Sequence, residues 1–268
     1  MGAGRAIPAE TFGIDWIRVS LPFPCEIHWC QPRRMEENGN YKVLMLNTEP
    51  AESVTGFDDL REIYHFFDLI IAADPRCAVF PNCVVRPFGS LWATKVPSRK
   101  EFSVSFLFSL GAMRPTRPGY AERKRFMQEL DAATVPVQVY KGRMFAGLDD
   151  IRFPLLPDDS KNRLFESMFH VAIENAFDVN YFTEKLLDCL ATYTVPVYMG
   201  CPNVGDYFDL DGMIIVRPGE SVVRAINGLS AADYWSRLGS IRENAARSLK
   251  YADYLVALRR IILTASGY

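Results

Sequence analysis

Residues Met168–Gly200 read MFHVAIENAFDVNYFTEKLLDCLATYTVPVYMG, and this stretch decides the fold class. Its apolar run Met168–Glu174 predicts a buried strand, and Thr194–Met199 predicts a second one. Between them, Thr183–Thr192 has the spacing of a helix, with its leucines on one side. Two strands joined by a helix form a βαβ unit, which requires parallel strands and a right-handed crossover. The sequence therefore predicts an α/β fold.

Strands and helices also alternate earlier in the chain. Tyr41–Asn47 (YKVLMLN) predicts a buried strand, and Phe57–Phe67 predicts a helix with one apolar face. Asp68–Ala73 and Asn82–Arg86 predict two more strands, which is the alternation of an α/β layer. The polar, proline-containing stretch Thr94–Lys100 then predicts a boundary, so we expect one domain over residues 1–97 and another over 98–268.

The bulk composition excludes several classes of protein. A formal net charge of -2 at pH 7 does not favour nucleic acid as a partner, because nucleic-acid-binding domains carry a basic excess. The N-terminus lacks the pattern of a signal peptide, and the longest apolar patch, Phe66–Ala73, is too short to cross a bilayer. We therefore expect a soluble, cytoplasmic protein with no membrane span in this chain. The six cysteines form no Cys-x-x-Cys pair, which favours reduced thiols over a zinc site.

The segment Glu174–Gly200 resembles the family-10 fucosyltransferases, the α1,3/α1,4 enzymes that use GDP-fucose. Their pattern is a strand ending in Glu-Asn, a short loop, Tyr-x-Thr-Glu-Lys, an apolar helix, a Val-Pro-Val/Ile-Tyr strand and a glycine. All of these elements stand here at matching spacing, and the likeness continues through Cys201–Phe208 (CPNVGDYF).

The resemblance implies a fold, a reaction and partners. The fold is GT-B, with two Rossmann-like domains facing each other across a cleft. Residues 1–97 would form the acceptor side and residues 98–268 the nucleotide-sugar donor side. The activity would be that of an inverting glycosyltransferase that moves a sugar, L-fucose from GDP-fucose first of all, to a glycan hydroxyl. The partners would be this donor and a glycan acceptor, with no metal or other cofactor.

Four candidate donor-binding residues lie within the quoted segment. Lys185 is in the first turn of its helix, where a cation and the helix N–H groups can stabilise the charge that develops on a departing diphosphate. Glu184 suits the ribose hydroxyls of the donor. The resemblance implies that Asn175 and Tyr181 contact the donor sugar and nucleotide.

Arg123 is the candidate for a further cation. The resemblance implies an arginine seven residues before an apolar helix position, and Arg123 precedes Leu130 by that interval. A guanidinium binds phosphate well because it offers two parallel donors. Neighbouring cations are alternatives for this role: Arg114, Arg117, Lys124 and Arg125.

The proposed reaction also needs a base. Inverting transfer requires a carboxylate to accept the proton of the attacking hydroxyl. The resemblance implies a glutamate after an N-terminal strand and shortly before a proline. Glu49, which precedes Pro50, is the candidate catalytic residue, and Glu52 is the reserve.

Two observations leave alternatives open. Asp209-Leu210-Asp211 has the D-x-D spacing of metal-dependent sugar transferases, and we interpret it as a turn. Ala176 and Val216-Arg217-Pro218 depart from the family pattern, so another donor such as UDP-xylose remains an alternative. An alternative function of a different class is that of a non-catalytic module that binds a nucleotide sugar or a glycan.

Overall fold

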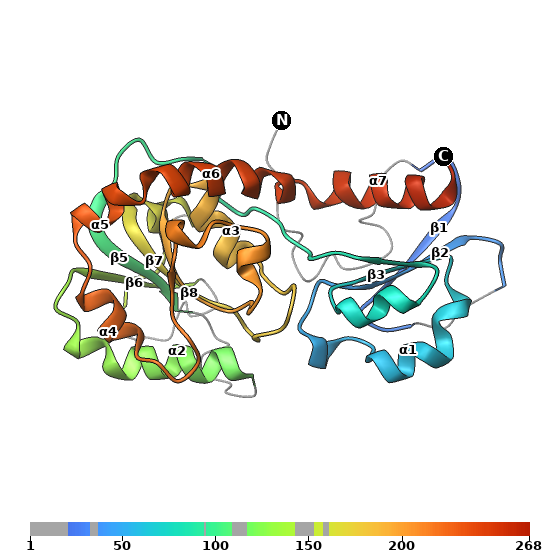
Figure 1. The fold of residues 1–268 in the computed structure, drawn as a ribbon, viewed down its shortest axis with the longest axis horizontal. Coiled ribbons are helices and arrows are strands. Elements are labelled where there is room, and N and C mark those ends of the chain that lie inside the picture. The colour runs from blue at the N-terminus through green and yellow to red at the C-terminus, as the bar shows by residue number, and fades with distance from the viewer. Residues whose placement is uncertain (1–20, 33–36, 94, 109–116, 143–152, 158–160) are drawn as a thin grey trace.

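Two parallel β-sheets lie at opposite ends of the molecule (Figure 1). The computed structural model describes residues 21–32, 37–93, 95–108, 117–142, 153–157 and 161–268. Arg114, an alternative to Arg123, and the side chain of Glu52 lie outside the described part.

The first sheet contains four parallel strands in the order β1-β2-β3-β4. They are β1 (Cys25–Trp29), β2 (Tyr41–Leu46), β3 (Leu69–Ala72) and β4 (Cys83–Val85). Helix α1 (Phe57–Ile63) covers one face, where Leu60 is fully buried against Leu44 and Ile70. The predicted strands and helix are present, whereas β1 was not predicted because its five residues contain no continuous apolar run.

The second sheet contains five parallel strands in the order β6-β5-β7-β8-β9. Its strands are β5 (Glu101–Phe108), β6 (Val137–Lys141), β7 (Ser167–Ile173), β8 (Val195–Met199) and β9 (Ile214–Ile215). The predicted βαβ unit is confirmed as β7, α3 and β8.

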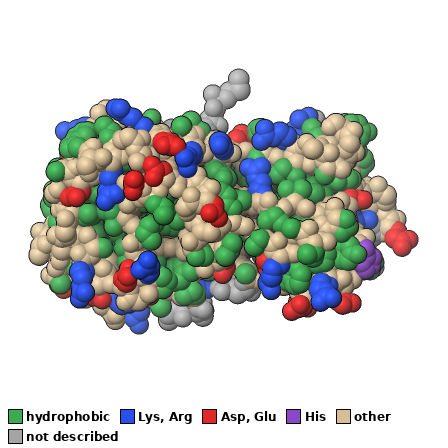
Figure 2. Space-filling model, in the orientation of Figure 1, with side chains coloured by type: hydrophobic (Ala, Val, Ile, Leu, Met, Phe, Trp, Pro, Cys, Tyr) green, Lys and Arg blue, Asp and Glu red, His purple; other side chains and the backbone are tan. Residues whose placement is uncertain are grey.

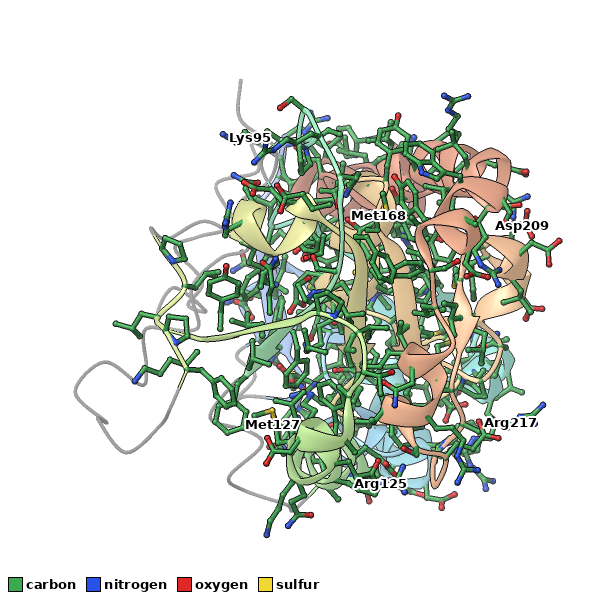
Figure 3. All side chains as sticks on the ribbon, turned by 90° about the vertical axis from the view of Figure 1, so that its left-hand side faces the viewer. Lys95, Arg125, Met127, Met168, Asp209 and Arg217 are labelled. Atoms are coloured by element: carbon green, nitrogen blue, oxygen red, sulfur yellow. The ribbon has the colours of Figure 1, made fainter. Side chains whose placement is uncertain are left out.

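Helices cover both faces of this second sheet. Successive β7 residues point to opposite sides, so Val171 packs in one core and Ala172 in the other. Helices α2 and α4 pack in the core that contains Val171, and α3 packs in the core that contains Ala172. Figure 3 shows α2, marked by Arg125 and Met127, at one side of the sheet that contains Met168. The helices are α2 (Pro118–Glu129), α3 (Glu184–Ala191), α4 (Val222–Asn227), α5 (Ala231–Ser236) and α6 (Leu238–Ser248).

The chain returns to the first sheet at its C-terminal end. Helix α7 (Tyr254–Ser266) follows α6 and runs along the top of Figure 1 towards β1. Its Leu258 and Ile262 are fully buried against Val43 and neighbouring residues of the first sheet. The range 98–268 expected for the second domain thus includes one helix that completes the core of the first sheet.

The surface carries charges of both signs, and Figure 2 shows basic and acidic side chains interspersed over one face. Within the described residues, no helix is both long and apolar enough to span a membrane. All six cysteines are free thiols, of which Cys77, Cys189 and Cys201 are buried.

Candidate active site

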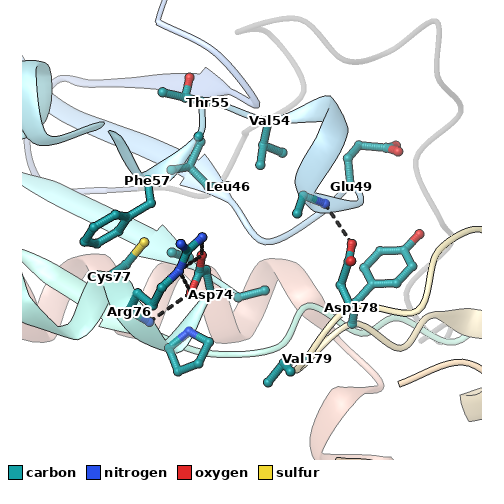
Figure 4. A pocket seen from close by; sticks show the side chains of 16 residues that line it. Leu46, Glu49, Val54, Thr55, Phe57, Asp74, Arg76, Cys77, Asp178 and Val179 are labelled. Carbon is teal, nitrogen blue, oxygen red and sulfur yellow. Dashed lines mark hydrogen bonds and ion pairs between the residues drawn. The ribbon is translucent and has the colours of Figure 1, made fainter. Parts of the chain in front are cut away.

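A cavity of about 430 Å³ lies where the two halves meet (Figure 4). Leu46 and Ala72, which end β2 and β3, line it from the first half, and Asp178 and Tyr181 line it from the loop after β7. Ligands of open parallel sheets bind at the carboxyl ends of the strands. The cavity therefore occupies the position where a substrate site is expected in both halves.

Glu49, the candidate base, lines this cavity from the first half. Its side chain is 42% exposed, and its Oε2 lies 3.7 Å from Nη1 of Arg117. Burial raises the pKa of Glu49, and the nearby cations Arg117 and Lys185 partly oppose that rise. A carboxyl group with a raised pKa is a stronger proton acceptor than an ordinary glutamate, which suits a general base. Glu52 lies in the short helical turn Ala51–Ser53, and its side chain is outside the described part.

Tyr181 faces the same cavity from the second half. It is only 4% exposed, and burial together with the carboxylates Glu174 and Glu49 raises its pKa well above the usual value. Its hydroxyl is therefore neutral at physiological pH and can donate a hydrogen bond to a ligand.

The loop that carries Tyr181 also joins the two halves. The backbone N–H of Ala51 donates to Oδ2 of Asp178 over 2.9 Å. Asn180 donates from Nδ2 to the backbone oxygen of Ala73 over 2.8 Å. Because Ala51 follows Glu49 by two residues, Asp178 fixes the loop that carries the candidate base.

Glu174, at the end of β7, fixes the start of α3. Its fully buried carboxylate accepts hydrogen bonds from the backbone N–H of Thr183, over 2.8 Å, and from its hydroxyl, over 2.7 Å. Thr183 in turn caps α3 by accepting from the N–H of Lys185. No role was predicted for Glu174 itself, although its position at the end of an apolar strand was a signal in the sequence.

Lys185 and Glu184 lie together in the first turn of α3. Nζ of Lys185 is 3.1 Å from Oε1 of Glu184 and 4.0 Å from Oε2 of Glu174. Burial raises the pKa of Glu184, but Lys185 and Lys161 outweigh it and bring this pKa to about 2. Glu184 is therefore ionised at neutral pH, and its oxygens can accept hydrogen bonds from hydroxyl groups.

Lys161 connects this first turn to the segment that joins the two sheets. Its Nζ lies 3.5 Å from Oε1 of Glu184, 3.3 Å from Oδ2 of Asp188 and 4.3 Å from the ring centre of Trp92. Asp188 is fully buried, and its Oδ1 accepts from the N–H groups of Trp92 and Ala93 over 2.7 and 2.8 Å. This network could not be predicted from sequence, because Lys161 lies in a stretch without apolar periodicity.

Arg123 lies beneath the end of β7 and is only 3% exposed. Its Nε donates to the backbone oxygen of Ile173 over 3.0 Å, and Nη2 donates to Oδ1 of Asn175 over 2.8 Å. Burial lowers the pKa of Arg123, and the nearby carboxylate of Glu174 opposes that fall. Arg123 thus orients the amide of Asn175 and leaves its Nδ2 as the donor group; contact with a phosphate stays a prediction.

Helix α2 approaches the same strand end very closely. The N–H of Gly119 donates to the backbone oxygen of Asn175 over 3.1 Å. A Cβ atom at position 119 would lie 1.7 Å from the backbone oxygen of Glu174, so only glycine fits there. The start of α2 is therefore held against the strand end that carries Glu174 and Asn175.

Asp209-Leu210-Asp211 forms a turn, which confirms the interpretation made from sequence. The side chain of Asp209 accepts from the N–H of Asp211 over 3.0 Å and caps the helical turn Leu210–Gly212. Figure 3 shows Asp209 at the periphery of the second half. In the described part of the chain, no group of three His, Cys, Asp or Glu residues is arranged to hold a metal ion.

Comparison with protein-family models matches residues 99–256 to glycosyltransferase family 10 (fucosyltransferase), C-terminal part. This match contains Arg123, Asn175, Tyr181, Glu184 and Lys185. A comparison with curated protein sequences gave no match.

Several solved structures share this architecture at low sequence identity. An α1,3-fucosyltransferase with GDP-fucose is 13% identical, with a TM-score of 0.50, covering 81% of this chain and 76% of that one. Anabaena Alr3699/HepE in complex with UDP is 14% identical, with a TM-score of 0.57 and coverages of 85% and 73%. Sucrose-phosphate synthase from Thermosynechococcus elongatus is 10% identical, with a TM-score of 0.54 and coverages of 85% and 68%. These likenesses confirm the GT-B fold predicted from sequence.

Proposed function

Since the chain belongs to glycosyltransferase family 10, the fucosyltransferase family, we propose that it transfers L-fucose from GDP-fucose to a glycan hydroxyl with inversion. The observation that supports the proposal most directly is the shared cavity. The candidate base Glu49 comes from one half, and Tyr181 comes from the donor-side loop of the other.

The proposed chemistry is a single displacement at the sugar's anomeric carbon. The acceptor oxygen forms the new bond to that carbon while Glu49 takes the hydroxyl proton. The bond from the carbon to the β-phosphate oxygen breaks, and the nucleoside diphosphate leaves with the electron pair. Because the base and the leaving group act on opposite sides of the carbon, they must come from separate parts of the site. Glu49 lies in the first half and Lys185 in the second, which supports this division.

The start of α3 would hold the leaving group. Lys185 and the positive end of the α3 dipole stabilise negative charge on the diphosphate. Glu184 accepts hydrogen bonds from the ribose, and Asn175 donates from the Nδ2 that Arg123 orients. Thr183 and Glu174 keep this first turn fixed, so the donor groups need little reorganisation during the reaction.

Competing donors in one assay test the choice of sugar. With GDP-fucose, UDP-xylose and UDP-glucose at equal concentration and a pool of glycan acceptors, we expect product to carry fucose. The reason is the family match over the whole donor half. Preferential use of any UDP-sugar would contradict the proposal, and binding of GDP-fucose without turnover under every acceptor would favour a non-catalytic binding module.

Lys185→Ala is expected to weaken binding of GDP by about 10- to 100-fold, because a hydrogen bond to a charged group contributes about 1.5–3 kcal/mol. Its side chain is 25% exposed, and its Nζ borders Glu174 and Glu184. Isothermal titration with GDP measures the effect. Lys250→Ala, which removes an exposed lysine far along the chain in a short turn after α6, is the matched control and should leave affinity unchanged. Equal affinities of the two variants would remove Lys185 from the donor site.

A further inference from the structure

Three contacts from the second half reach the turn that carries the candidate base. We call residues 49–53 the base turn, since they begin with Glu49. The backbone N–H of Ala51 donates to Oδ2 of Asp178, and Figure 4 shows this bond at the end of the cavity where Glu49 lies. The other two contacts come from Arg117, which precedes α2.

The guanidinium of Arg117 crosses from the second half to the base turn. Its Nη2 donates to Oγ of Ser53 over 2.5 Å, and its Nη1 lies 3.7 Å from Oε2 of Glu49. The side chain of Arg117 is 22% exposed, so its charge is largely withdrawn from water. A planar guanidinium offers several donors in fixed directions. Because both oxygens belong to the base turn, Arg117 restrains the carboxylate together with the backbone that carries it.

The backbone at Arg117 is itself closely held. Its conformation is extended, as expected for a residue before a proline, and Pro118 begins α2. The N–H of Gly119 then donates to the backbone oxygen of Asn175, and a Cβ atom at position 119 would collide with the backbone oxygen of Glu174. The guanidinium therefore extends from a point that is fixed against the end of β7.

The charge of Arg117 also acts on Glu49. Burial raises the pKa of Glu49, and Arg117 is the strongest of the groups that oppose this rise. Lys185 opposes it less, and the carboxylate of Glu184 adds to it. Burial likewise raises the pKa of Tyr181, and Arg117 opposes that rise too. Arg117 thus influences groups on both sides of the cavity.

We propose that Arg117 is a positioning residue, which orients the carboxylate of Glu49 towards the acceptor hydroxyl from the second half, while Asp178 holds the base turn. The inference rests on the proposed function and adds how its base is aligned. An unrestrained glutamate samples several rotamers, whereas proton transfer needs its oxygen within about 2.6–3.2 Å of the hydroxyl. Since the restraint comes from the half that binds the donor, it aligns the base relative to the donor sugar.

Arg117→Ala is expected to lower kcat about 10- to 100-fold, because a small misplacement of a catalytic group has effects of that size. The affinity for GDP should change less than about threefold, since the lost interaction is made with the base and not with the donor. Arg117→Lys keeps the charge without the planar fork, so it should restore part of kcat. Single-turnover rates and GDP titration measure both quantities.

Arg61→Ala is the matched control. Arg61 is an exposed arginine of α1 that does not line the cavity, so this variant should keep the kcat and the GDP affinity of the unmodified protein. A loss of GDP affinity in Arg117→Ala as large as that in Lys185→Ala, with kcat unchanged, would overturn the inference and make Arg117 a donor ligand.

A double-variant cycle determines whether Arg117 acts through Glu49. In the Glu49→Gln background, Arg117→Ala should lower turnover by less than about twofold, because the base that it orients has already been removed. Equal losses in the two backgrounds would overturn the positioning role.

The pKa of Glu49 gives a readout that does not depend on turnover. Carbon-13 NMR of labelled carboxyl groups follows this pKa in the full chain, and the Glu49→Gln spectrum identifies the signal. Loss of the neighbouring positive charge should raise the pKa of Glu49 in Arg117→Ala, whereas Arg117→Lys and Arg61→Ala should stay close to the unmodified protein. An unchanged pKa in Arg117→Ala would contradict the contact on which the inference depends.

The pKa and kcat together distinguish orientation from basicity. A raised pKa makes Glu49 a stronger base, which by itself favours proton transfer. If kcat nevertheless falls at a pH where Glu49 is ionised in every variant, the loss comes from orientation.

The inference and the proposed function fail in different ways. If the unmodified protein turns over no GDP-fucose with any acceptor, the proposed reaction is refuted, even where the pKa of Glu49 confirms the contact with Arg117. If turnover is intact and Arg117→Ala keeps a normal kcat, only the positioning role is refuted.

Discussion

Glu49→Gln is expected to lower turnover by about a hundred- to ten-thousand-fold while donor affinity stays close to that of the unmodified protein. Glutamine keeps the shape of the side chain and one acceptor oxygen, but it cannot take a proton from the attacking hydroxyl. Burial raises the pKa of Glu49, so the acid limb of the turnover–pH profile should lie above the range of an ordinary glutamate. That limb should disappear in the variant.

Single-turnover rates and GDP-fucose titration, measured together, separate chemistry from folding. Glu52→Gln is the matched control, since it changes the neighbouring carboxylate of the same loop. If Glu52→Gln loses turnover and Glu49→Gln does not, the base is Glu52. If both variants keep near-normal turnover, the base lies elsewhere in the chain.

Asp188→Ala is expected to lower the free energy of unfolding by about 3–5 kcal/mol, because it breaks a buried ion pair and also removes the acceptor of two backbone N–H groups. Asp188 is fully buried, where it bonds to Lys161 and to two backbone N–H groups of the connecting segment. The alanine variant leaves all three donors without this acceptor. Urea unfolding followed by circular dichroism measures the loss.

Two further variants separate this effect from general damage to the fold. Asp188→Asn keeps one acceptor oxygen for the backbone donors, so it should cost clearly less than alanine. Glu166→Ala removes the half-buried partner of the exposed Arg163, and surface ion pairs contribute only about 0–1 kcal/mol. A loss for Asp188→Ala no larger than that for Glu166→Ala would contradict the buried-network interpretation.

The local pattern of apolar residues was sufficient to predict the βαβ unit of the second half. Apolar runs of five to seven residues separated by a helical period predicted β7, α3 and β8 within one or two residues. The family resemblance further predicted a base role for Glu49 and a donor-binding role for Tyr181. Both residues line the same cavity, and their roles stay predictions. Such features can be predicted from the sequence because they depend on residues that are neighbours along the chain or on a motif of known spacing.

Contacts between segments that are distant along the chain could not be predicted from local patterns. Arg123 was predicted as a phosphate ligand from its spacing, and only the docking of α2 on β7 reveals that its guanidinium holds Ile173 and Asn175. Lys161 showed no signal in an irregular loop, although it pairs with two carboxylates. The packing of α7 on the first sheet depends on contacts between the two ends of the chain, which no local period encodes.

That return of α7 has a consequence for the order in which the protein can fold during synthesis. The strands β1–β3 leave the ribosome early, yet the apolar face that includes Val43 and Leu69 is covered by Leu258 and Ile262. Until residues 254–266 emerge, the first sheet exposes an apolar surface suited to unwanted association, and its core cannot be completed before α7 has been synthesised. The donor half, whose two cores draw on residues from 91 to 252, can fold before α7 is complete. Vectorial folding would thus finish at the sheet whose strands were synthesised first.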